Sequence, residues 1–135
     1  MRRGSVLRVL GLVLGATMAT TAASQARTDF PFGKELLLDT RPMKGSKRIP
    51  ILDIQDNGAA AIDLWCNSVQ AQFVVVNDTV TVMTGSPTNR LCPPEREQGD
   101  QEIMAALTQV TNWRREGDSL VLIGPRTLRF RLQSN

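Results

Sequence analysis

The apolar residues after position 30 fall mostly into short runs separated by turn-forming residues, which is typical of a chain built from antiparallel strands. Residues 79–82 alternate threonine with valine, and residues 128–132 alternate leucine or phenylalanine with arginine. A period of two places one side of each strand in a core and the other in water. The pattern predicts strands at residues 35–38, 49–54, 59–64, 70–76, 79–82, 119–123 and 128–132.

Three turn signals connect these runs. Asn57-Gly58 and Asn77-Asp78 each separate two apolar segments, and Glu116-Gly117-Asp118 precedes the strand at 119–123. Asn and Gly tolerate positive φ and therefore favour tight hairpin loops. We expect hairpins at Asn57-Gly58 and at Asn77-Asp78.

The period changes once, after the proline-rich segment at residues 84–94. Ile103, Met104, Leu107 and Val110 lie at helical spacing, and acidic residues are concentrated earlier in the segment, where the helix dipole favours them. This helix begins either near Pro94 or at Asp100 acting as its cap, and we expect it to end near Asn112. The predicted fold is a small α+β domain, an antiparallel, curved and barrel-like sheet of six to seven strands with one packed helix.

The first 26 residues predict a cleaved secretory signal. Arg2, Arg3 and Arg8 precede an apolar run at 9–19, which is shorter than the about twenty residues that a membrane span needs. Small residues at Ser24 and Ala26 fit a cleavage site after Ala26. A retained anchor is the alternative. If the signal is cleaved, as we expect, the mature domain comprises residues 27–135, has no transmembrane segment, and is exported to the periplasm or secreted.

Removing the signal changes the meaning of the charge. The chain has 16 basic and 13 acidic residues; subtracting the three signal arginines leaves 13 of each, so the mature net charge is zero. A basic surface for nucleic acid is therefore not indicated. We expect a monomer whose partner is an envelope protein or a small ligand.

Composition also limits the chemistry. The chain has no histidine and no tyrosine, which excludes histidine-dependent nucleophiles and histidine metal sites. Acid–base work by a carboxylate pair among Asp53, Asp56, Asp63 and Asp78 stays open, although turns explain most of these positions. We predict no catalytic residues, no metal and no cofactor.

The two cysteines, Cys66 and Cys92, are expected to form a structural disulfide in an exported domain of this size. Thiol redox chemistry is the weaker alternative, because the residues do not form a Cys-x-x-Cys pair. Trp65 could mark a binding face or fill the core. Asn67 could turn the backbone through its amide.

Several of these residues together resemble a known family. Cys66-Asn67, then Thr88-Asn89-Arg90-Leu91-Cys92, then the helix occur in the order seen in the META domain of the HslJ-like proteins, with its Gly-Cys-Asn and Thr-x-x-x-Cys motifs. Two positions depart from that pattern, since Trp65 and Ala71 stand where the family has glycine. The resemblance implies a β-rich domain with one helix, found in bacterial envelope proteins linked to heat shock and antibiotic resistance, with no established catalytic activity.

The resemblance makes Trp65, Asn67, Thr88 and Arg90 the candidate binding residues, beside the cysteine pair. The function expected is that of a non-catalytic envelope protein of the stress response, acting as a binding or scaffold module. A small secreted inhibitor of an envelope-acting hydrolase is the alternative, and it requires a protruding loop, for which residues 39–48 are the candidate.

Overall fold

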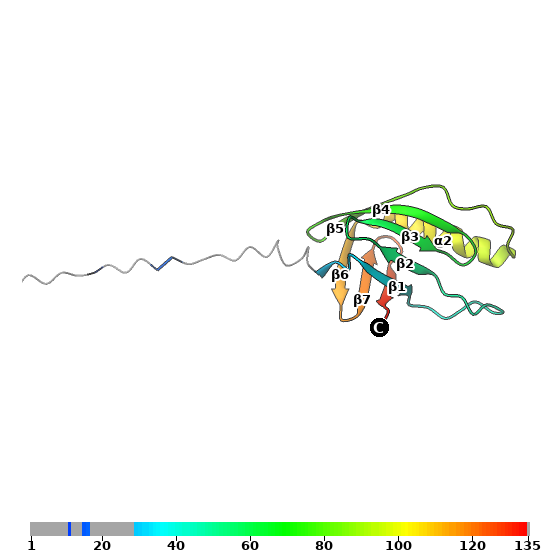
Figure 1. Ribbon diagram of the computed structural model, residues 1–135, viewed down its shortest axis with the longest axis horizontal. Coiled ribbons are helices and arrows are strands. Elements are labelled where there is room, and N and C mark those ends of the chain that lie inside the picture. Colours follow the sequence, from blue (N-terminus) through cyan, green and yellow to red (C-terminus); the bar gives the residue numbers. More distant parts are fainter. Residues whose placement is uncertain (1–10, 12–14, 17–28, 135) are drawn as a thin grey trace, which may run out of the picture.

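The protein is an eight-stranded antiparallel barrel with one helix, seen in a computed structural model that describes residues 11, 15–16 and 29–134 (Figure 1). Each strand pairs with the next one in the sequence, and β8 pairs with β1 to close the barrel. The predicted signal peptide lies outside the described residues apart from three isolated positions. The strands are β1 (Lys34–Leu38), β2 (Ile51–Ile54), β3 (Ala59–Asp63), β4 (Ser68–Val76), β5 (Thr79–Thr84), β6 (Asn112–Glu116), β7 (Ser119–Ile123) and β8 (Leu128–Leu132).

The turns form where the sequence predicts them. Asn57-Gly58 joins β2 to β3, and Asn77-Asp78 joins β4 to β5. Gly58 has φ of 84° and Asn77 has φ of 53°, so both occupy the left-handed region that these residue types tolerate. Both predicted hairpins are confirmed.

Alternation along the strands fills the barrel interior. In β8, Leu128 and Phe130 are buried, whereas Arg129 and Arg131 point away from the core. The same inward set recurs in β1, β2, β3 and β7, where Leu36, Leu52, Ile62 and Leu122 are fully buried. The predicted α+β class, with a curved antiparallel sheet and one helix, is confirmed.

The helix, α2 (Pro94–Gln109), begins at Pro94, which occupies a first-turn position where a missing N–H costs nothing. The alternative start, with Asp100 as the cap, is wrong, because Asp100 lies inside the helix. The predicted end near Asn112 is three residues late. Asn112 is already the first residue of β6, a strand that the sequence pattern did not reveal.

Strand β6 is difficult to recognise because it reads Asn-Trp-Arg-Arg-Glu, with Trp113 as its one buried side chain. It exists because β7 supplies a full antiparallel partner, from Asn112 opposite Ile123 to Glu116 opposite Ser119. Towards β5 the pairing is brief and centres on Thr79 opposite Asn112. Pairing on one edge therefore stabilises a segment whose own composition is polar.

Helix α2 packs against β5, the strand that β6 pairs with only at its first residue. Ile103, Ala106 and Leu107 of the helix are buried and join the hydrophobic core. The helix thus supplies apolar cover where the sheet is least continuous. It also brings its amino-terminal half near the loop between β3 and β4.

Candidate functional site

Three of the predicted site residues, Trp65, Cys66 and Asn67, lie in the loop between β3 and β4. The Leu64 N–H donates to the Asn67 carbonyl at 2.8 Å and closes the loop into a tight turn. The loop is nearly inaccessible, since Trp65, Cys66 and Asn67 are 6%, 8% and 9% exposed. A polar backbone buried to this degree needs hydrogen-bond partners from elsewhere in the fold.

Asp100 supplies two of those partners. Its Oδ1 accepts the Cys66 N–H at 3.1 Å, and its Oδ2 accepts the Asn67 N–H at 2.8 Å. The carboxylate is 5% exposed, and it reaches from the middle of α2 across more than 30 positions in the sequence. Charged acceptors make stronger hydrogen bonds than neutral ones. Asp100 therefore anchors the loop to the helix, a role that nothing in its sequence position predicts.

Asn67 holds the segment that precedes the helix. Its Oδ1 accepts the Thr88 hydroxyl at 3.1 Å and the Arg90 N–H at 2.7 Å. Thr88 is also tied to Ser68, whose N–H donates to the Thr88 Oγ1 at 2.9 Å. The structure therefore brings Asn67, Thr88 and the Arg90 backbone together, whereas the exposed Arg90 side chain takes part in none of these contacts.

The two cysteines complete this junction. Cys66 and Cys92 lie at disulfide distance, with their Cα atoms 6.2 Å apart, within the usual range for a disulfide. Their bond spans 26 positions and joins the β3–β4 loop to the start of α2. The Asp100 carboxylate joins the β3–β4 loop to α2, whereas the Asn67 carboxamide and the disulfide join the same loop to the segment before the helix.

Trp65 points to a different side of the loop. A Cβ built on Gly99 would lie 2.7 Å from Trp65 Cδ1 and 2.5 Å from Met43 Cε, so the indole occupies space that only a glycine on the helix leaves free. Trp65 also lines a hollow of about 400 Å³ whose rim includes Arg126, paired with Glu102 at 3.1 Å. Trp65 is therefore mainly a core residue, separated from Asn67 and Thr88.

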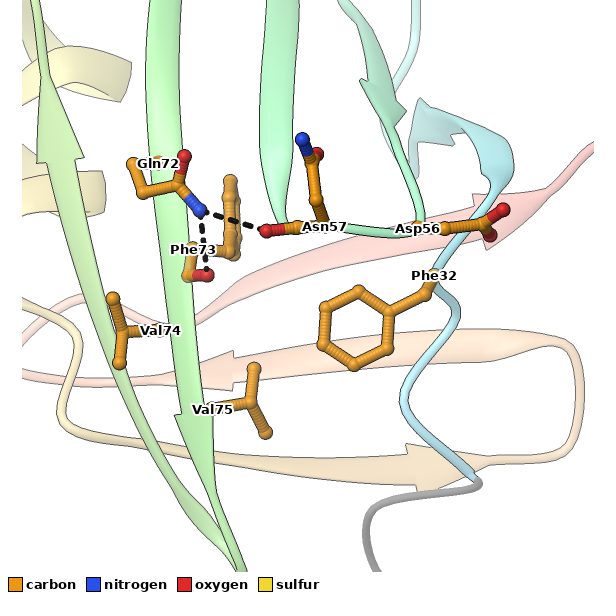
Figure 2. A pocket seen from close by; sticks show the side chains of 7 residues that line it. All are labelled: Phe32, Asp56, Asn57, Gln72, Phe73, Val74 and Val75. Carbon is orange, nitrogen blue, oxygen red and sulfur yellow. Dashed lines mark hydrogen bonds between the residues drawn. The ribbon is translucent and has the colours of Figure 1, made fainter.

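Asn67 and Thr88 line a second hollow, of about 310 Å³, between α2, the β3–β4 loop and the segment before the helix. A third hollow, of about 530 Å³, lies near the β2–β3 turn and contains none of the predicted site residues (Figure 2). In this third hollow, Phe32 and Val75 point toward one another, and Gln72 Nε2 donates to the Asn57 carbonyl at 3.0 Å. Both carboxamides that line this hollow, those of Asn57 and Gln72, thus make hydrogen bonds to the backbone of the β2–β3 turn.

The chemistry of the described residues is limited. Asp100 is the one buried acid among residues 29–134, and Asp53, Asp56, Asp63 and Asp78 are at least partly exposed. No group of three metal-ligating side chains converges in this part of the chain. The paired buried carboxylates that an acid–base mechanism needs are therefore not found among the described residues.

The motif geometry agrees with a comparison against protein families, in which the META domain matches residues 37–135. The chain belongs to the META domain family. The match includes the Cys66-Asn67 loop, Thr88 and Cys92. Gly99 of the helix leaves the space that Trp65 occupies.

Solved structures support the fold of this META domain. An NMR structure of a protein from Burkholderia xenovorans is similar with a TM-score of 0.65 and 14% identity, covering 94% of this chain and 100% of that one. A second NMR structure gives a TM-score of 0.59 and 14% identity, with 84% and 96% covered. At this identity the likeness concerns the fold alone. The curated proteins contain no match to the chain.

Proposed function

We propose that this META domain protein is an exported, non-catalytic binding module of the bacterial envelope. The observation that carries the proposal is the fixed hollow of about 310 Å³ beside the motif residues Asn67 and Thr88. Small-molecule sites are concave, largely preformed and combine apolar walls with a few oriented polar groups. The anchoring of the β3–β4 loop by Asp100 supplies that rigidity.

The non-catalytic part of the proposal is supported by how the motif atoms are used. The Asn67 oxygen and both Asp100 oxygens accept hydrogen bonds from other parts of the chain. Groups used in this way hold backbone segments, and a catalytic group needs free access to a reacting atom. The motif therefore has a structural role that does not depend on any reaction.

Export is supported by the sequence of the first 26 residues and by the cysteine pair, since disulfides persist in oxidising compartments. Among the described residues, no helix is long and apolar enough to cross a membrane. Mass spectrometry of the protein from a periplasmic fraction should give a chain that begins at Arg27 and lacks free thiols. A full-length chain in the cytoplasm with two alkylatable cysteines would contradict export.

Binding can be tested on the protein as its host makes it. Native mass spectrometry of material purified from the envelope fraction under mild conditions should show a bound small molecule that is lost on unfolding. Light scattering on the same sample should give a monomer. A bare chain, together with no thermal shift from extracts of envelope metabolites, would contradict the binding role and leave the scaffold role.

The inhibitor hypothesis also has a structural observation in its favour. The loop between β1 and β2 projects beyond the strands, as Figure 1 shows, and most of residues 39–48 are exposed. It carries the basic residues Arg41, Lys44, Lys47 and Arg48. A pull-down from periplasmic extract should then recover one hydrolase, and deletion of residues 41–47 should abolish recovery. Recovery that survives the deletion would exclude this loop as the inhibitory element.

The proposed role in the stress response is supported by the family resemblance alone. A strain lacking the protein should grow normally at moderate temperature and poorly after heat shock or with envelope-directed antibiotics. Complementation by the wild-type chain, but not by one lacking residues 1–26, would connect the phenotype to export. Equal growth of both strains under all of these conditions would refute a stress role.

A further inference from the structure

The hollow beside the motif, here called the Asn67 pocket, has one side chain whose orientation is fixed by the protein. Asn67 Oδ1 faces the Arg90 N–H at 2.7 Å, and a backbone N–H can only donate, so this end of the carboxamide must be the oxygen. The Thr88 hydroxyl takes a second position on the same oxygen at 3.1 Å. The Asn67 NH₂ group is therefore directed away from both partners.

That NH₂ group has no protein acceptor. Asn67 Nδ2 donates no hydrogen bond to any described residue, although Asn67 is 9% exposed. Among the described residues, every side-chain nitrogen or oxygen that is fully buried has a hydrogen-bond partner. Since Asn67 Nδ2 has no such partner, it must retain some exposure to solvent. Asn67 is one of the residues that line the pocket, and we place this access there. The pocket thus presents a preoriented donor at an otherwise enclosed residue.

The other lining groups define what such a donor could meet. The charged residues at the pocket are Glu97 and Asp100, both acidic, and no basic side chain lines it. An anionic ligand is therefore disfavoured by like charge. Leu64, Pro87 and Met104 supply apolar surface, while Asn89 and Gln101 add carboxamides that can accept as well as donate.

We propose that the Asn67 pocket binds an uncharged amide group that carries a small apolar substituent. The carbonyl oxygen of the ligand accepts a hydrogen bond from Asn67 Nδ2, and the ligand N–H donates to the carboxamide oxygen of Asn89 or Gln101. The apolar part of the ligand packs on Leu64, Pro87 and Met104. A volume of about 310 Å³ is at the lower end of the range for small-molecule sites, so the bound group is small. This inference rests on the proposed binding function and specifies its ligand chemistry.

Two envelope sources provide this chemistry, namely peptides and N-acetylated sugars. The test titrates ¹⁵N-labelled protein with N-acetyl-L-leucinamide, and in parallel with N-acetyl-D-glucosamine, while following the side-chain NH₂ signals of Asn67. Saturable shifts with the first probe alone identify a peptide-like ligand, and shifts with the second alone identify a sugar. The N-acetyl-L-leucine anion should bind more weakly than the neutral leucinamide.

Two variants separate recognition from folding. Asn67→Asp keeps an oxygen for Thr88 and Arg90 but replaces the donor. Its binding is followed through the backbone amide signals of the pocket residues, because the variant has no side-chain NH₂ group at position 67. The affinity should fall by about tenfold or more, as for the loss of one hydrogen bond. Met104→Trp leaves Asn67 intact and fills the pocket, so it should abolish the shifts. Val74→Ala, on the outer face of β4, is the matched control and should bind as the wild type does.

The assignment is overturned if neither neutral probe shifts the Asn67 signals, or if both pocket variants bind as the control does. These outcomes differ from failure of the proposed function. A protein that carries a small molecule from its host, yet whose Asn67 signals do not respond, refutes the pocket and preserves the binding role.

Discussion

The contact between Asp100 and the β3–β4 loop gives the sharpest stability prediction. In Asp100→Ala, the Cys66 and Asn67 N–H groups both lose their acceptor while remaining in a loop that is less than a tenth exposed. Each buried donor left unsatisfied costs about 1–3 kcal/mol. Two such donors give an expected loss of about 2–6 kcal/mol, with the lower end applying if water enters.

Asp100→Asn retains one acceptor oxygen in nearly the same shape, so its cost should be roughly half that of Asp100→Ala. Gln101→Ala is the matched control, because Gln101 is the exposed neighbour on the same helix and donates to no loop atom. For a domain of this size, each kcal/mol lowers the melting temperature by about 4–8 °C. Urea unfolding followed by tryptophan fluorescence, with the disulfide intact, measures all three variants.

The order Asp100→Ala, then Asp100→Asn, then Gln101→Ala is the expected ranking of destabilisation. Amide hydrogen exchange adds a local readout, because the Cys66 and Asn67 amides should lose protection in Asp100→Ala before the strand amides do. If Asp100→Ala costs less than 1 kcal/mol and both amides stay protected, the carboxylate does not anchor the loop.

Three further predictions concern other contacts. Gly99→Ala should destabilise the protein, because the new Cβ meets the Trp65 indole and the Met43 methyl group. In a Trp65→Ala background the flexible end of Met43 can move into the freed space, so the same change should be neutral or stabilise by up to about 1 kcal/mol through helix propensity. A double-mutant cycle by urea unfolding without this reversal would contradict the packing. Reduction of the Cys66–Cys92 disulfide should lower the free energy of unfolding by about 3–4 kcal/mol, because the bond closes a long loop in the unfolded chain. Denaturation with and without a reductant measures this loss. An unchanged midpoint would show that the bond is absent or does not stabilise the fold. Hydrogen bonds from Arg114 and, to a smaller extent, Arg129 hold the pKa of Glu116 below its usual range. Glu116 therefore stabilises the fold at pH values above its unfolded pKa, and this stabilisation is lost as the pH falls through the lower pKa of the folded state. An NMR titration of the Glu116 carboxyl group with an ordinary midpoint would refute this prediction.

Local sequence determined the strands and turns with clear signals. Asn57-Gly58 and Asn77-Asp78 set hairpins because their preferred backbone conformations match the turns, whatever lies around them. The alternation around Phe130 set the inward face of β8 in the same local way. The predicted export signal and the cysteine pair are likewise read from composition and order, and of the two only the cysteines lie fully within the described residues.

Tertiary structure decided the features that depend on a distant partner. Strand β6 forms because β7 offers a register, and its polar residues gave no periodic signal of their own. The sequence offers Asp100 as a possible helix cap, because acidic residues are common at that position. In the structure its carboxylate instead accepts the Cys66 and Asn67 N–H groups of the β3–β4 loop, more than 30 positions earlier in the chain. Gly99 and Trp65 likewise explain each other only when α2 rests against the loop.

The candidate site shows the same division. The order of motifs in the sequence marked Asn67 and Thr88, because residue identity and spacing are enough to recognise a family. Which end of the Asn67 amide accepts hydrogen bonds from the chain, and which end stays unpaired, depends on the Arg90 N–H that the fold brings to it. The sequence therefore identified the residues, and three-dimensional packing decided which of their atoms hold the neighbouring segments and which make no hydrogen bond within the described chain.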